Sequence, residues 1–166
     1  KLLDTLWLRM QRDLVDVVVP VRDAAWWQHR YASHPEHQYQ CFWIRSRWSR
    51  RTIGVVALRV HRSTASLERE GEVWELMDWL CEVADTAVML QSAKDIVSAK
   101  GGVSLMGWFS SAVRAQFPGA TAQEVCAVSV TVPSNGQDFP LGRGFSASVA
   151  ALENKWWLTS GDTDFR

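Results

Sequence analysis

Hydrophobic residues recur every three or four positions at the start of the chain, a spacing that places them on one side of a helix. They are Leu3, Leu6, Trp7, Met10 and Leu14. Residues 1–16 are therefore predicted to be helical, and Pro20 ends the helix because the residue before a proline avoids the helical conformation. Asp23 is predicted to cap a second helix that extends to Tyr31.

Stretches rich in β-branched and aromatic residues predict the strands. They are residues 38–46, 52–61, 73–80, 103–106, 125–132 and 155–160. The first two are joined through Ser46 to Arg51 and are predicted to form an antiparallel hairpin. Predicted helices at about 86–100, closed by Gly101-Gly102, and from Trp108 onward separate the later strands. A strand–helix–strand unit favours parallel pairing, so the chain is predicted to be an α+β protein with a mixed sheet flanked by helices.

Length, charge and cysteine content narrow the class of protein. The 166 residues suit one domain, and Lys plus Arg equals Asp plus Glu at 18 each. No nucleic-acid partner is expected, because such proteins usually carry a basic excess. No apolar run approaches the length of a membrane span. Cys41, Cys81 and Cys126 form no metal or redox spacing, which favours a reducing cytoplasm. Because the chain begins at Lys1, we expect it to be the C-terminal part of a longer polypeptide.

The ten tryptophans are an unusual number for this length. Each is large, and its indole N–H needs a hydrogen-bond partner, so some are expected at an interface. We expect at least two of five to be exposed on one continuous face. The five are Trp7, Trp26, Trp48, Trp108 and Trp156.

Four segments resemble the GNAT N-acyltransferase superfamily. Residues 26–39 (WWQHRYASHPEHQY) are similar to the helix and turn that enter the GNAT hairpin, and residues 54–59 (GVVALR) to the second strand of that hairpin. Residues 75–80 (ELMDWL) stand where the central strand is expected, and residues 156–164 (WWLTSGDTD) resemble the ending of such proteins. The resemblance implies a GNAT-like domain over residues 23–166, preceded by a linker helix within residues 1–22.

The same resemblance implies an acetyl-CoA site, and the sequence departs from the family at that point. In the family, a glycine-containing loop after the central strand holds the pyrophosphate with backbone N–H groups. Residues 81–86 (CEVADT) contain no glycine, and Glu82 and Asp85 would repel phosphate. Acetyl-CoA is therefore doubtful as a cofactor of this domain, and the chain is similar to the degenerate half of a tandem acyltransferase.

Three functions follow from these observations as alternatives. The first is a domain that shapes the acceptor side, for a small-molecule amine or sugar, or supports a partner half. That partner would be an upstream domain of the same polypeptide or a second copy. The second is an active acyltransferase with an unorthodox CoA loop. The third is a non-enzymatic interaction module.

Two carboxylates and two arginines are the candidate site residues. Glu75 or Asp78 on the central strand would act as a general base, and three residues apart on a strand they are predicted to face opposite sides. Arg45 and Arg59 are candidates to bind the phosphates of CoA. They belong to a larger group on or near the hairpin, namely Arg45, Arg47, Arg50, Arg51, Arg59 and Arg62. The alternative for these arginines is a solvated hairpin balanced by nearby glutamates, and for the carboxylates an ion pair with a hairpin arginine.

No metal site is predicted. His34 and His37 flank a Pro-Glu turn without further ligands at a suitable spacing, so they are interpreted as turn residues. Asp162 and Asp164 are two apart near the end of the chain, which favours a polar terminal turn.

Overall fold

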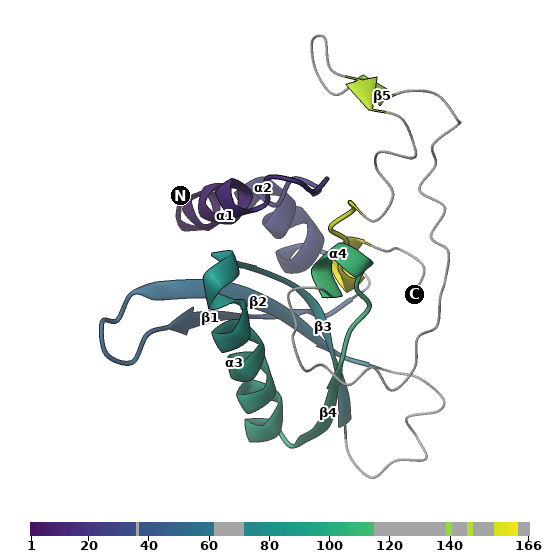
Figure 1. The fold of residues 1–166 in the computed structure, drawn as a ribbon. Coiled ribbons are helices and arrows are strands. Elements are labelled where there is room, and N and C mark those ends of the chain that lie inside the picture. The colour runs from purple at the N-terminus through teal and green to yellow at the C-terminus, as the bar shows by residue number, and fades with distance from the viewer. Residues whose placement is uncertain (36, 62–71, 115–138, 141–145, 148–154, 163–166) are drawn as a thin grey trace.

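A computed structural model describes residues 1–35, 37–61, 72–114, 139–140, 146–147 and 155–162. Its centre is a four-stranded sheet (Figure 1). In sheet order the strands are β1 (Gln40–Arg45), β2 (Thr52–Val60), β3 (Glu72–Cys81) and β4 (Gly102–Met106). The first two pairings are antiparallel and the third is parallel, with α3 (Thr86–Ala99) connecting β3 to β4. The predicted α+β class with a mixed sheet and flanking helices is confirmed.

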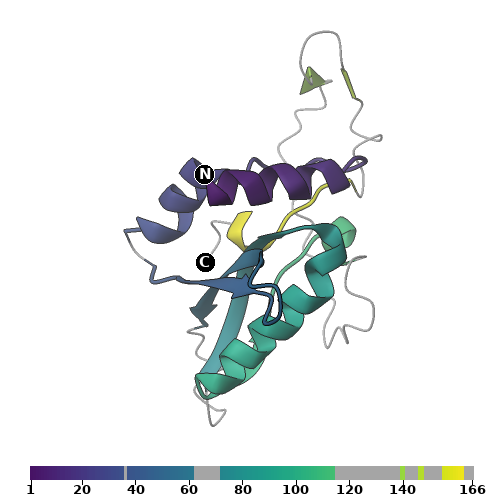
Figure 2. The same ribbon diagram turned by 90° about the vertical axis from the view of Figure 1, so that its left-hand side faces the viewer.

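Helices cover both faces of this sheet (Figure 2). On one face lie α1 (Leu2–Asp13) and α2 (Ala24–Trp27), which continues as a π-helix over Gln28–Ala32, and α3 covers the other face. α1 buries Leu6, Trp7 and Met10 in the same core as the sheet residues, whereas α3 contributes Met89, Ala93 and Val97. α1 ends three residues earlier than the predicted 1–16.

The helix ends show where local capping rules applied and where tertiary contacts replaced them. The Asp23 side chain accepts a hydrogen bond of 2.8 Å from the Trp26 N–H, as predicted for a cap. Gly101 follows α3 with φ +82°, the left-handed conformation that glycine adopts at low cost. Asp85 occupies the position before α3, but its side chain makes no capping bond and instead binds Arg51 at 3.1 Å.

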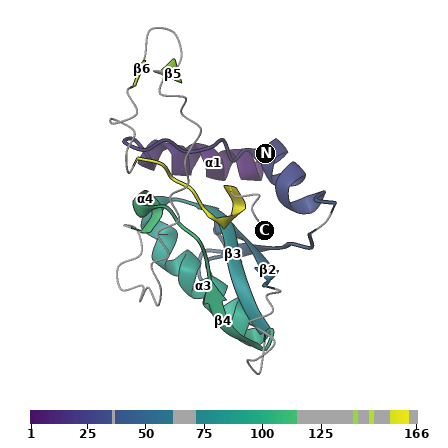
Figure 3. The same ribbon diagram turned by 90° about the vertical axis from the view of Figure 1, so that its right-hand side faces the viewer.

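The C-terminal part differs most from the prediction. Residues 155–160 do not form a strand, because only Trp156 makes an isolated parallel bridge, to Val18. Ser160–Asp162 instead forms a 3₁₀ turn. The helix predicted from Trp108 is a short α4 (Ser111–Arg114), and the predicted strand 125–132 lies outside the described residues. A small hairpin pairs β5 (Phe139–Pro140) with β6 (Ser146–Ala147) (Figure 3).

Two of the five selected tryptophans are exposed, Trp48 at 93% and Trp108 at 37%. Trp48 lies between β1 and β2, whereas Trp108 follows β4 at the opposite edge of the sheet. The expectation of a single continuous tryptophan face was therefore wrong for this pair, and Trp7 is buried in the core.

Candidate functional site

An irregularity in β3 determines which way the candidate carboxylates point. Asp78 lies opposite Ala57, and Leu76 lies opposite Leu58, which leaves Met77 as an extra residue in β3. Such a bulge shifts the alternation of side chains. Glu75 lies opposite Arg59, two residues from Ala57 on β2, so Glu75 and Asp78 share a face of the sheet. The prediction that they face opposite sides was wrong because it assumed a regular strand.

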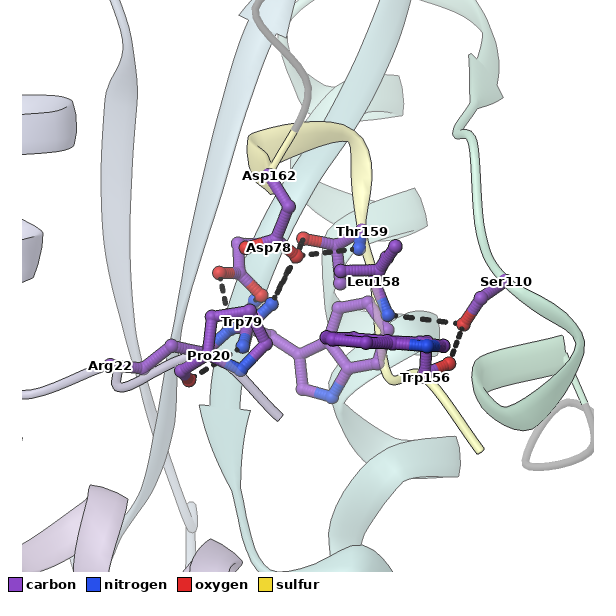
Figure 4. A network of polar contacts seen from close by, with 9 residues as sticks. All are labelled: Pro20, Arg22, Asp78, Trp79, Ser110, Trp156, Leu158, Thr159 and Asp162. Carbon is purple, nitrogen blue, oxygen red and sulfur yellow. Dashed lines mark hydrogen bonds and ion pairs between the residues drawn. The ribbon is translucent and has the colours of Figure 1, made fainter. Parts of the chain in front are cut away.

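Asp78 is fully buried and is held by two hydrogen bonds (Figure 4). Its Oδ2 accepts from Arg22 Nε at 2.7 Å, and its Oδ1 accepts from the Trp79 N–H at 2.8 Å. Arg22 is also fully buried. A buried carboxylate of this kind is stable only with such partners, so this ion pair is part of the core of the domain.

Arg22 joins this pair to the C-terminal segment. Its Nη2 donates to Asp162 Oδ2, and its Nη1 donates to the Pro20 carbonyl oxygen at 3.0 Å. Asp162 Oδ2 also accepts from the Thr159 N–H at 2.8 Å and from Thr159 Oγ1 at 3.2 Å. The loop before α2, the middle of β3 and the 3₁₀ turn are thus connected through one guanidinium (Figure 4).

This cluster places two carboxylates beside one buried guanidinium. Burial raises the pKa of Asp78 to about 6, with the Arg22 charge opposing the rise and the Asp162 charge adding to it. Burial likewise raises the pKa of Tyr31 well above its ordinary value. The Tyr31 hydroxyl oxygen is itself buried, and it has no hydrogen-bond partner among the residues that the structure describes. The cluster therefore holds more negative charge than one arginine balances.

The raised pKa of Asp78 predicts a pH dependence of stability. Because the folded chain binds a proton at Asp78 more tightly than the unfolded chain, the contribution of this group falls as pH rises from about 4 to about 6. The shift corresponds to a loss on the order of 2 kcal/mol across that window. Denaturant unfolding measured from about pH 4 to about pH 8 checks this, with Asp78→Asn as the comparison. The stability difference between wild type and this variant should change across the window, and a constant difference would contradict the assignment.

Glu75 lies on the same face and is paired separately. Its Oε2 accepts from Arg59 Nε at 3.0 Å and from Arg59 Nη2 at 2.8 Å, and His61 Nδ1 lies at 3.7 Å. Glu75 is fully buried. Glu75 thus forms an ion pair with a hairpin arginine, which is the alternative that the sequence analysis gave for the two carboxylates.

The two arginines predicted to bind CoA are not brought together. Arg45 pairs with Thr52 where β2 begins, whereas Arg59 is next to the last residue of β2. Arg45 is exposed, and Arg59 is bound to Glu75. They therefore cannot bind neighbouring phosphates as one site.

The segment that follows β3 is occupied by contacts within the chain. The Val83 N–H donates to Asp13 Oδ2 at 2.9 Å. Glu82 lies between two arginines, at 3.5 Å from Arg9 and 3.6 Å from Arg51, and Asp85 binds Arg51 as well. Arginines thus offset the charges of Glu82 and Asp85, which weakens the repulsion of phosphate that the sequence predicts for these two residues.

The C-terminal segment lies over the β3 bulge. The Ser110 N–H donates to the Leu158 carbonyl oxygen at 3.0 Å, and the Trp108 N–H donates to Ser160 Oγ at 2.8 Å. A Cβ atom added at Gly161 would lie 3.1 Å from the Met77 carbonyl oxygen and 2.0 Å from the Tyr31 hydroxyl. The segment therefore covers Met77 and Tyr31 closely, and Asp78 beneath it has no exposed surface.

Sequence reasoning found Glu75 and Asp78 and considered a hairpin arginine as a partner of such a carboxylate, but it did not find the partners of Asp78. Arg22 stands in a short loop between Pro20 and Asp23 and carries no pattern that distinguishes it from a surface arginine. Asp162 was considered as a metal ligand together with Asp164 and was interpreted as part of a polar terminal turn. Within the described residues, no group of three or more His, Cys, Asp or Glu side chains is arranged to hold a metal ion.

Comparisons with known proteins find no matching family model, and neither curated proteins nor solved structures give a significant match. The helices that the structure describes fall short of the length and apolar character needed to cross a membrane.

Proposed function

We propose that this domain is a GNAT-like acyltransferase half that does not itself hold acetyl-CoA and that supports a catalytic partner half. The observation that carries the proposal is the state of the segment after β3. The Asp13 carboxylate already occupies the Val83 N–H, a group that a pyrophosphate would otherwise approach. An anion at this point would have to displace a carboxylate of the chain itself.

The order of the strands supports the same proposal. Two antiparallel pairings followed by a parallel one, with α3 between β3 and β4, are compatible with the arrangement that the resemblance implies. The proposed supporting role also agrees with the burial of Glu75 and Asp78, because a general base must reach the proton that it removes. Both carboxylates are engaged by arginines instead.

Titration of the purified chain with acetyl-CoA tests the proposal. We expect no saturable heat of binding, because residues 81–86 offer neither a glycine nor a free run of N–H groups. A dissociation constant of about 1 μM or tighter, equivalent to about −8 kcal/mol, would contradict it. Thermal unfolding of the same sample verifies that the chain titrated is folded.

A second candidate is an acyltransferase in which Asp78 is the general base. The raised pKa of Asp78, about 6, favours it, because a base works best when its pKa lies near the working pH. The two proposals predict different effects of one substitution on kcat. In a polypeptide that carries both halves, Asp78→Asn should lower kcat by roughly 10²–10⁴ if Asp78 is the base. It should leave kcat within a few-fold if the domain only supports its partner, provided that the variant is folded.

A further inference from the structure

The connection between β1 and β2 carries the most exposed aromatic side chain among the described residues. Trp48 is 93% exposed. Arg45, Arg47 and Arg50 flank it and are exposed too. Within the part of the chain that the structure describes, none of these three arginines forms an ion pair. We call residues 45–50 the hairpin tip.

Hydrogen bonds within the connection fix its conformation. The Ser46 N–H donates to the Arg51 carbonyl oxygen at 2.8 Å, and the Arg50 N–H donates to the Ser46 carbonyl oxygen at 2.9 Å. Arg50 has φ +55°, a left-handed conformation that costs a non-glycine residue roughly 1–2 kcal/mol. The turn therefore has a defined conformation in which Trp48 is exposed to solvent. It keeps this conformation despite the strain at Arg50 and the exposure of a large indole.

An indole with a ring of cations has a recognisable chemical complement. Tryptophan combines an apolar ring with an N–H donor and is favoured where hydrocarbon meets a polar layer. Arginine binds phosphate oxygens through a planar pair of donors. We propose that the hairpin tip docks on the surface of an anionic phospholipid bilayer. Trp48 enters the headgroup layer, and Arg45, Arg47 and Arg50 pair with lipid phosphates and carboxylates.

The shape of the tip favours a bilayer over other anionic partners. The β1–β2 connection projects away from the helices as a convex loop (Figure 1). Single-stranded nucleic acids bind in basic grooves that follow the backbone, which a convex loop does not provide. A stable protein interface usually needs about 20–30 residues a side, far more than the tip offers. A bilayer requires neither a groove nor a large contact area, because each basic or aromatic group that enters it contributes its own binding free energy.

This proposal goes beyond the supporting role proposed above and does not depend on it. Docking through the tip leaves the Asp78 cluster untouched, since the tip adjoins Thr52 at the start of β2, whereas Asp78 lies opposite Ala57, five residues further along that strand. Neither result of the acetyl-CoA titration therefore bears on the tip, and the two proposals fail separately.

Vesicle flotation with the purified chain tests the proposal. The probes are vesicles of phosphatidylcholine alone and of phosphatidylcholine mixed with phosphatidylserine. We expect binding to the mixed vesicles only, weakened as salt rises from about 0.1 M to about 1 M, since the screening length falls from about 10 Å to about 3 Å. Trp48→Ala should weaken partitioning about tenfold, and the double variant R47Q/R50Q about 25-fold, at roughly fivefold for each arginine.

Matched variants separate the tip from general charge and hydrophobicity. K94Q/K155Q removes the same two charges from exposed positions on α3 and the C-terminal segment. Leu8→Ala removes an exposed apolar side chain from α1. Both controls should partition as wild type. Arg47, Trp48 and Arg50 are exposed, so their variants are expected to unfold at the wild-type temperature.

Three results would overturn the proposal. Equal binding to both kinds of vesicle would exclude recognition of anionic lipid. Equal losses in the tip variants and the matched controls would exclude the tip as the contact. Binding of a single-stranded oligonucleotide that depends on Trp48, without vesicle binding, would assign the tip to nucleic acid instead.

Discussion

Arg22→Met should lower the free energy of unfolding at pH 7 by about 3–5 kcal/mol, the usual cost of removing one partner from a buried ion pair. The side chain of Arg22 is fully buried between Asp78 and Asp162, so its removal leaves two carboxylates without a cation in the protein interior. Methionine fills much of the volume of arginine, so the loss reports charge more than packing. Urea unfolding monitored by tryptophan fluorescence measures the change.

The charge explanation has its own controls. In the Arg22→Met background, replacing Asp78 and Asp162 by asparagine should recover part of the loss, because the uncompensated charges are then absent. Arg12→Met removes an exposed arginine and should change stability by less than about 0.5 kcal/mol. If Arg22→Met costs less than about 1 kcal/mol at pH 7, the cluster is not the stabilising element described here.

Gly161→Ala should destabilise the domain by about 1–3 kcal/mol, because the new methyl group overpacks a filled site. Its Cβ would lie 2.0 Å from the Tyr31 hydroxyl oxygen and 3.2 Å from Tyr31 Cζ. Tyr31→Phe in the same chain should recover much of the loss, because it removes the atom that makes the closest contact. Thermal or denaturant unfolding of both single variants and the double variant forms the required cycle.

The single variant Tyr31→Phe measures what the hydroxyl contributes to stability when Gly161 is unchanged. The buried hydroxyl finds no hydrogen-bond partner in the described part of the chain, so its loss should be neutral or slightly stabilising. Gly101→Ala is the contrasting glycine variant. It meets no atom within 4 Å but has φ +82°, so its cost comes from backbone conformation, and Tyr31→Phe should not relieve it. A Tyr31→Phe loss above about 1 kcal/mol would show that the hydroxyl has a partner after all.

The sheet could be predicted because its signal is local. Alternating and β-branched residues marked 38–46, 52–61 and 73–80, and the strands run over 40–45, 52–60 and 72–81. The bounds of α3 were predicted to within one residue, because its hydrophobic periodicity and the glycine that ends it are both signals from residues close together in the sequence. Residues 155–160 have a strand-like composition, yet they make only one bridge, because their backbone groups are divided between Val18 and Ser110.

The candidate site depends on contacts between residues far apart in the sequence, which local sequence patterns do not predict. Asp78 stood out as an acid within an apolar strand, but its orientation depends on the extra residue Met77, which only the pairing with β2 reveals. Its pKa depends on Arg22, 56 positions away, and on Asp162. No spacing rule connects residues that the fold alone brings together, so the partners of Asp78 could not be predicted from the sequence.

The Arg22–Asp162 contact joins residues 140 positions apart, nearly the full length of the chain. During synthesis the N-terminal helices and the first three strands leave the ribosome long before residue 162. Until then Arg22 and Asp78 have each other but lack the turn that covers them. Contacts between residues so far apart in sequence tend to form slowly, so we expect the C-terminal segment to close over β3 after the β2–β3 pairing has formed. Until residues 155–162 have been made and have docked, the β3 bulge stays uncovered.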